Sequence, residues 1–136
     1  MYEVFDHTAD LGLRITAGSY AELLAEAGRG LCSVLVENIE AVQPVREVTI
    51  RIPGTANDYL LFDWLTELLY RYESEGLLLV DFSPAVDDEG VTVVARGETV
   101  DGERHQRTHE VKAVTYHLLE VSETAAGWEA AVILDI

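Results

Sequence analysis

A long amphipathic helix in the middle of the 136-residue chain is the feature that most constrains its fold. Large apolar residues recur there every three or four positions, on one helix face: Leu61, Trp64, Leu65, Leu68, Leu69 and Tyr72. We predict a helix over 57–75 that ends at Gly76. Its N-terminal cap is either Asn57 or Thr55 with Asp58 three residues on. Because such a stripe is stable only when it is covered, the rest of the chain has to bury it.

A second helix is predicted over about 19–36. Ser19 and Glu22 form a capping box at its start, and apolar residues follow at near-helical spacing. Gly28 and Gly30 weaken this helix locally. They do not form a phosphate-binding loop, because such a loop follows a strand and opens a helix, whereas these glycines lie inside one.

The remaining apolar residues alternate with polar ones or form short continuous runs, as they do in strands. The predicted strands lie at 2–6, 11–15, 48–52, 77–82, 91–100, 118–121 and 128–134. Turns are expected at 7–10 and 87–90. A short helix is expected at 106–115, where the pattern is less periodic.

This order of elements predicts the α+β class. A strand-helix-strand-strand succession appears near the start of the chain and again near its end, with the helix at 57–75 between them. We expect an antiparallel or mixed sheet with the helices packed against it. No low-complexity tract or Pro/Gly/Ser linker divides the chain, so we expect a single domain over residues 1–136.

The charge balance limits the partners. Nine Lys and Arg residues face 25 Asp and Glu residues, which gives a net charge of −16 with neutral histidines. A surface this acidic repels phosphates, so we expect no direct nucleic-acid binding and no attachment to anionic membranes. Any connection to RNA then has to run through a protein partner or a bridging cation.

Cysteine use and the first residues predict a cytoplasmic protein. A single cysteine, Cys32, cannot form an internal disulfide, which fits a reducing compartment. The first residues carry acids where a signal peptide carries positive charge, and no apolar run reaches the ~20 residues of a membrane span. Cys32 lies on an apolar helix face, and we assign it, with Trp64 and Tyr70 of the central stripe, to the core.

Two weak metal patterns also occur. His105 and His109 are four residues apart and, with His117, have residue types that ligate zinc; we favour surface histidines, because no further ligand follows at recognisable spacing. The acidic run 87–89 lacks the alternating oxygen ligands of a calcium loop, and we favour a solvated turn.

The two ends of the chain form a stronger candidate. Asp10 follows the first predicted strand, and Asp135 stands next to Ile136, the last residue of the sequence, so two carboxylates crowd together there. If the last strand lies beside the first, Asp10 adds a third hard oxygen ligand, which suits Ca²⁺ or Mg²⁺. The alternative is that these acids are solvated, as acids at turns and chain ends usually are.

Four blocks of the sequence together resemble the archease family. They are FDHTADLG at 5–12, DWL at 63–65 with ELLY at 67–70, VKAVTYH at 111–117 and AVILDI at 131–136. The blocks stand in the family's order and cover the chain from its first residues to its last.

The resemblance implies a function. Archease-like proteins activate the GTP-dependent RNA ligase that joins tRNA halves; they promote guanylylation of a histidine on that ligase and so allow multiple turnovers. They are not enzymes themselves. The resemblance also implies strand-helix-strand-strand elements, one of them carrying an insertion.

The resemblance places a divalent-cation site at Asp10, Asp135 and the terminal carboxylate of Ile136. Ca²⁺ is favoured there over Mg²⁺ or Mn²⁺. Two further residues are candidates for ligase activation. His7 either orients the Asp10 turn or acts near the nucleotide, and Lys112, the single lysine, either faces a phosphate or pairs with an aspartate.

Two other function classes stay open. One is a general chaperone or adaptor for nucleic-acid-modifying proteins, in which the cation only holds the chain ends together. The other is a small metal-dependent hydrolase, against which stands the lack of a recognisable nucleophile or general-base pair.

Overall fold

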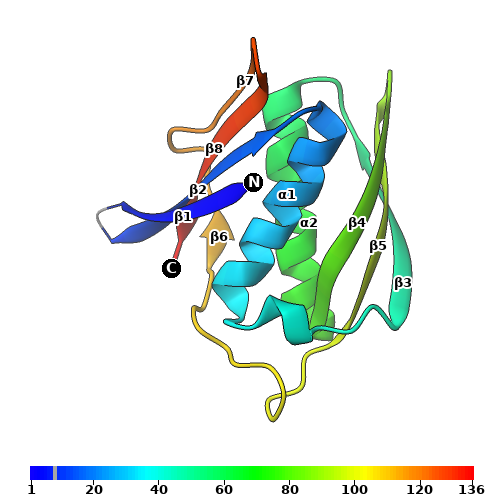
Figure 1. The fold of residues 1–136 in the computed structure, drawn as a ribbon, viewed down its shortest axis with the longest axis vertical. Coiled ribbons are helices and arrows are strands. Elements are labelled where there is room, and N and C mark those ends of the chain that lie inside the picture. Colours follow the sequence, from blue (N-terminus) through cyan, green and yellow to red (C-terminus); the bar gives the residue numbers. More distant parts are fainter. Residues whose placement is uncertain (8) are drawn as a thin grey trace.

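The helix predicted in the middle of the chain is the centre of the molecule (Figure 1). The structure, a computed structural model, describes residues 1–7 and 9–136. Helix α2 spans Asn57–Glu75 and ends at Gly76, whose φ of 65° is a left-handed value that glycine adopts without strain. Trp64 is fully buried, and its indole N–H donates a hydrogen bond of 2.9 Å to the carbonyl of Leu24 on the other long helix. The prediction of this helix and of its end is confirmed.

Every predicted strand is present, with its ends shifted by a few residues. The elements are β1 (Tyr2–His7), β2 (Asp10–Ala17), α1 (Tyr20–Leu35), the 3₁₀ turn η1 (Ile39–Ala41), β3 (Arg46–Pro53), α2, β4 (Leu77–Asp87), β5 (Gly90–Thr99), β6 (Ala113–Val114), β7 (Glu120–Thr124) and β8 (Gly127–Asp135). The Ser19 side chain caps α1 by accepting from the Glu22 N–H, as predicted. Neither long helix of the described chain combines the length and apolar composition needed to cross a membrane.

Two antiparallel sheets enclose the helices. The first sheet has the order β1-β2-β8-β6, with β7 also paired to β8, and the second has the order β3-β5-β4. Figure 1 shows α1 and α2 between these sheets, where their apolar faces meet apolar side chains of both. The α+β class and its antiparallel sheets are therefore confirmed.

The order of the elements shows one unit inserted into another. The first sheet is built from both ends of the chain, whereas the second is built only from the continuous stretch 46–99. That stretch is itself a strand-helix-strand-strand unit, β3-α2-β4-β5. The repetition expected near the end of the chain is thus misplaced: the second complete unit lies in the middle and contains the Trp64 helix.

The short helix predicted at 106–115 is wrong. The stretch is extended, and its backbone completes the end of α1: the N–H groups of Thr108 and His109 donate to the carbonyls of Leu35 and Val34. The last carbonyls of a helix have no partners within the helix and need partners from elsewhere. Satisfying them holds this segment extended, and it then forms β6, a strand the sequence did not predict.

Two details of α2 also differ from the predictions. The N-cap is Ala56, which makes no side-chain hydrogen bond, so neither predicted cap is used. Tyr70 is 62% exposed rather than buried with Trp64. Six residues at about 100° each bring Tyr70 to a different face of the helix, which explains the error.

Replacing Trp64 tests the centre of the core. We expect Trp64→Ala to lower the free energy of unfolding by about 3–5 kcal/mol, because it removes a fully buried ring and leaves the Leu24 carbonyl without its donor. Urea denaturation measures the change. Tyr70→Ala on the same helix is the matched control and should stay within about 0.5 kcal/mol of wild type. Equal effects of the two substitutions would contradict the central place of Trp64.

Candidate functional site

The β1–β2 hairpin positions Asp10. Its register pairs Phe5 with Gly12 and ends with His7 across from Asp10. The Phe5 ring covers Gly12 so closely that a Cβ there would lie 2.1 Å from the ring. The guanidinium of Arg14, two residues further along β2, lies 4.8 Å from the centre of the same ring. This packing explains why the first sequence block combines Phe5 and Gly12. Within the predicted turn at 7–10, Thr8 lies outside the described residues.

Strand β8 brings the end of the chain beside Asp10. β2 and β8 are antiparallel, and the last pair of their ladder is Leu11 with Leu134. Asp10 and Asp135 are the next residues of the two strands, so the same register brings them across from one another. Leu11 and Leu134 point into the core, and because side chains alternate along a strand, the two aspartates belong to the outer face of the sheet.

Strand β6 supports Asp135 from the other side. Ala113 pairs with Asp135, and the Lys112 N–H donates a hydrogen bond of 2.7 Å to the Asp135 carbonyl. Lys112 itself is exposed, and its ammonium group forms no ion pair with any residue the structure describes. The second alternative given for Lys112, a pair with an aspartate, is therefore not formed within the described chain.

Asp10 and Asp135 are half-buried and form no ion pair within the described residues. This donor set fits a hard divalent cation, which prefers oxygen ligands. Among the described residues, however, no three His, Cys, Asp or Glu side chains gather as metal ligands. Side chains of the described residues therefore supply two carboxylates at this place and no third ligand.

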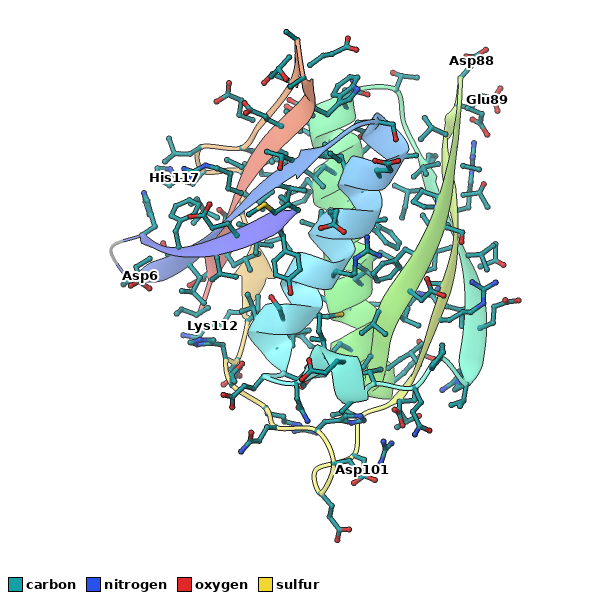
Figure 2. All side chains as sticks on the ribbon, viewed as in Figure 1. Asp6, Asp88, Glu89, Asp101, Lys112 and His117 are labelled. Carbon is teal, nitrogen blue, oxygen red and sulfur yellow. The ribbon has the colours of Figure 1, made fainter. Side chains whose placement is uncertain are left out.

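His117 joins this region, a placement that the sequence did not predict. Its ring centre is 5.5 Å from that of His7, in an edge-to-face arrangement. The Nδ1 atom of His7 is buried and has no hydrogen-bond partner in the part of the chain that the structure describes. Figure 2 shows His117 and Lys112 on the side of the first sheet, far from Asp88 and Glu89 at the tip of the β4–β5 hairpin. No spacing rule links residues 7 and 117, so only the folded chain shows the pair.

Comparison with known proteins assigns the family. A sequence model of the Archease protein family (MTH1598/TM1083) matches residues 2–136. The chain belongs to the archease family. Among its relatives, protein archease of Methanopyrus kandleri is 40% identical over 99% of both chains. Protein archease of Pyrococcus furiosus is 32% identical over 99% of this chain and 98% of its own.

Two solved structures have the same fold. The solution structure of Methanobacterium thermoautotrophicum protein 1598 superposes with a TM-score of 0.87 at 33% identity, over 99% of this chain and 98% of its own. The crystal structure of a Thermotoga maritima protein, described as an archease and possible chaperone, has a TM-score of 0.69 at 23% identity, over 100% and 98%. The archease fold expected from the four sequence blocks is thus confirmed.

The predicted grouping of surface histidines is wrong for His105. His105 is 2% exposed; its Nδ1 accepts from the Asp101 N–H, and its Nε2 lies 3.4 Å from the Glu98 carboxylate. The backbone N–H of Gln43, together with Arg104, lowers the pKa of this buried Glu98 below its ordinary value. His105 and Glu98 thus join the 101–106 loop to β5 and to Gln43, which follows η1. His109 is exposed on the extended segment.

The acidic turn is a structural feature. Asp87 forms a two-point ion pair with Arg51, at 2.9 and 3.1 Å, and accepts from the Glu89 N–H. These contacts, Arg51 first, lower the pKa of Asp87 to about 2. Its carboxylate is therefore already engaged by a cation of the protein itself, and Asp88 and Glu89 are exposed, as a solvated turn requires.

Cys32 is buried, as predicted. Its thiol donates to the carbonyl of Leu79, and burial raises its pKa to about 12. A thiol with this pKa holds almost no thiolate at neutral pH.

We expect Cys32 to resist alkylation by iodoacetamide in the native protein at pH 8. The thiolate is the reactive form, and both burial and the raised pKa suppress it. Mass spectrometry should detect the alkylated chain only after denaturant is added. Labelling of the native protein as fast as that of the unfolded chain would contradict this placement.

Proposed function

We propose that this protein activates the GTP-dependent RNA ligase of tRNA splicing by direct contact, promoting guanylylation of the ligase histidine and multiple turnovers. Membership of the archease family over residues 2–136 is the observation that carries the proposal. In this proposal the protein is a partner of the enzyme and catalyses no reaction of its own. The RNA is handled by the ligase, because a chain of net charge −16 repels phosphates.

The proposal includes a divalent-cation site formed by Asp10, Asp135 and the carboxylate of Ile136. Two half-buried aspartates that form no ion pair in the described chain support it, because neighbouring negative charges need compensation. Ca²⁺ is favoured over Mg²⁺ or Mn²⁺, since it accepts irregular oxygen geometry. When bound, the cation supplies positive charge beside nucleotide phosphates.

His7 and Lys112 are proposed to act from the same end of the sheet. The backbone N–H of Lys112 binds the Asp135 carbonyl, and its exposed ammonium group is free of ion pairs in the described chain, so that it can approach a phosphate of the nucleotide bound to the ligase. His7 lies across from Asp10 in the hairpin, and its buried Nδ1 is available to hold a neighbouring group in place. Phosphoryl transfer depends chiefly on positioning and on neutralising charge, and these side chains offer both.

A second candidate function is that of a general chaperone or adaptor. The description of the Thermotoga maritima structure as a possible chaperone favours it. Titration of the purified ligase with labelled GTP separates the two functions. Faster guanylylation at substoichiometric amounts of this protein supports the activator, whereas binding without a rate change supports the adaptor.

Replacing the aspartates tests the cation site. We expect Asp10→Ala and Asp135→Ala each to weaken Ca²⁺ binding at least about tenfold in calorimetric titration, because each removes a direct ligand. Ligase guanylylation should lose its acceleration in parallel. Asp88→Ala, an exposed aspartate at the far hairpin tip, is the matched control and should behave as wild type. Normal Ca²⁺ binding by both variants, with unchanged circular dichroism, would rule out the proposed ligands.

The role of Ile136 has its own test. A C-terminal peptide tag converts the carboxylate of Ile136 to a neutral amide, so we expect Ca²⁺ affinity to fall about tenfold. The same tag placed before Met1 is the control. It disturbs the contacts of the N-terminal ammonium with the Thr16 carbonyl, at the other end of the hairpin, and with Glu26 on α1. Equal Ca²⁺ affinity of the two tagged forms would contradict a role for the terminal carboxylate.

A further inference from the structure

A hollow on the surface lies between the start of α2 and the turn that precedes β7. Its lining consists of Asp58, Tyr59, Tyr116 and Leu119, and its volume is about 390 Å³. The lining contains two aromatic rings and one carboxylate, and no Arg, Lys or His. The sequence patterns did not place these residues together, because α2 and the turn are far apart along the chain.

The aromatic wall of the hollow is held in place yet open to solvent. Tyr116 stacks on Phe62 with ring centres 3.9 Å apart and 12° between the planes, and it meets Tyr59 edge-to-face at 5.7 Å. Tyr59 and Tyr116 are nevertheless both 56% exposed. Rings locked by their neighbours lose little conformational entropy when a partner covers them, which is the property of binding hot spots.

The backbone of the turn carries strain at this place. The Leu119 N–H closes the turn by donating to the Tyr116 carbonyl. Leu118, inside it, has φ 55°, and is the only non-glycine residue of the described chain with a positive φ. The conformation costs about 1–3 kcal/mol and leaves Leu118 61% exposed. Burial of the Leu118 side chain within this fold does not compensate the strain. An apolar side chain held in water by a strained backbone is therefore typical of a contact surface.

The charge of the hollow specifies its ligand. The Asp58 carboxylate accepts from the Tyr59 N–H and forms no ion pair in the described chain. A guanidinium group stacks on aromatic faces and donates two parallel hydrogen bonds to a carboxylate. We propose that this hollow binds an arginine side chain on the surface of the partner protein. Stacked RNA bases fit less well, because Asp58 and the net charge of −16 repel their phosphates.

The position of the hollow relative to the β1–β2 hairpin indicates a role for the contact. His117 stands in the same turn, and its ring contacts His7 at the end of the hairpin that carries Asp10. A partner anchored in the hollow is therefore held next to the hairpin that carries Asp10. This inference rests on the proposed function, since the partner in question is the ligase, and it assigns docking and activation to different residues.

The test measures the Kd of the ligase complex and the guanylylation rate for the same set of variants. We expect Tyr116→Ala and Asp58→Asn each to raise the Kd about tenfold, through loss of the stacking face and of the carboxylate charge. Tyr116→Phe keeps the ring and should change the Kd less than about threefold. Tyr70→Ala, an equally exposed tyrosine on α2 outside the hollow, is the matched control and should leave the Kd unchanged.

The rates separate the two proposals. At saturating concentration Tyr116→Ala should accelerate guanylylation as wild type does, whereas Asp10→Ala should not at any concentration. Unchanged Kd values for Tyr116→Ala and Asp58→Asn overturn the arginine site and leave the activator role standing. A wild-type protein that neither binds nor activates the ligase overturns both. Dimerisation of wild type in sedimentation, lost in Tyr116→Ala, identifies a second copy as the occupant and also overturns the arginine site.

Discussion

The antiparallel pairing of β2 with β8 is the constraint on which the rest of the structure depends. It joins Leu11–Ala17 near the start of the chain to Trp128–Leu134 near its end. The inward side chains of the two strands, including Leu13, Ile15 and Val132, are fully buried against the helices. Because this ladder connects the two ends, the stretch 46–99 can form its own sheet as an insertion without leaving an apolar face of either helix uncovered.

The same pairing determines where the distinctive chemistry lies. Asp10 and Asp135 continue the ladder beyond Leu11 and Leu134, and β6 fixes Asp135 from the other side. Carboxylates held on paired strands have less freedom than carboxylates on loops, so a site built there is organised before a ligand arrives. His117 approaches His7 from the turn that follows β6, which brings the candidate site and the arginine hollow to one side of the molecule.

The acidic residues that give the chain its net charge of −16 have different roles. Arg51 neutralises Asp87, and Arg104 together with the backbone N–H of Gln43 stabilises the Glu98 carboxylate, so these two acids support the fold. Asp10, Asp135 and Asp58 form no ion pair in the described chain. In our proposals the unpaired acids meet a cation and a basic protein surface, which is the complementarity that gives specificity and fast association.

Local patterns in the sequence determined the elements and the family. Interactions between residues close in the sequence determine the helix around Trp64, the cap at Ser19 and the alternating strands. The four sequence blocks identified the archease family. Tertiary structure alone decided what depends on distant partners. The segment 106–115 became extended because α1 needed its backbone donors, and His105 became buried because Glu98 and the Asp101 N–H surround it. His7 meets His117 through the order of the strands, and Tyr59 meets Tyr116 because α2 packs against the segment between β6 and β7; no spacing in a sequence encodes which distant segments will meet.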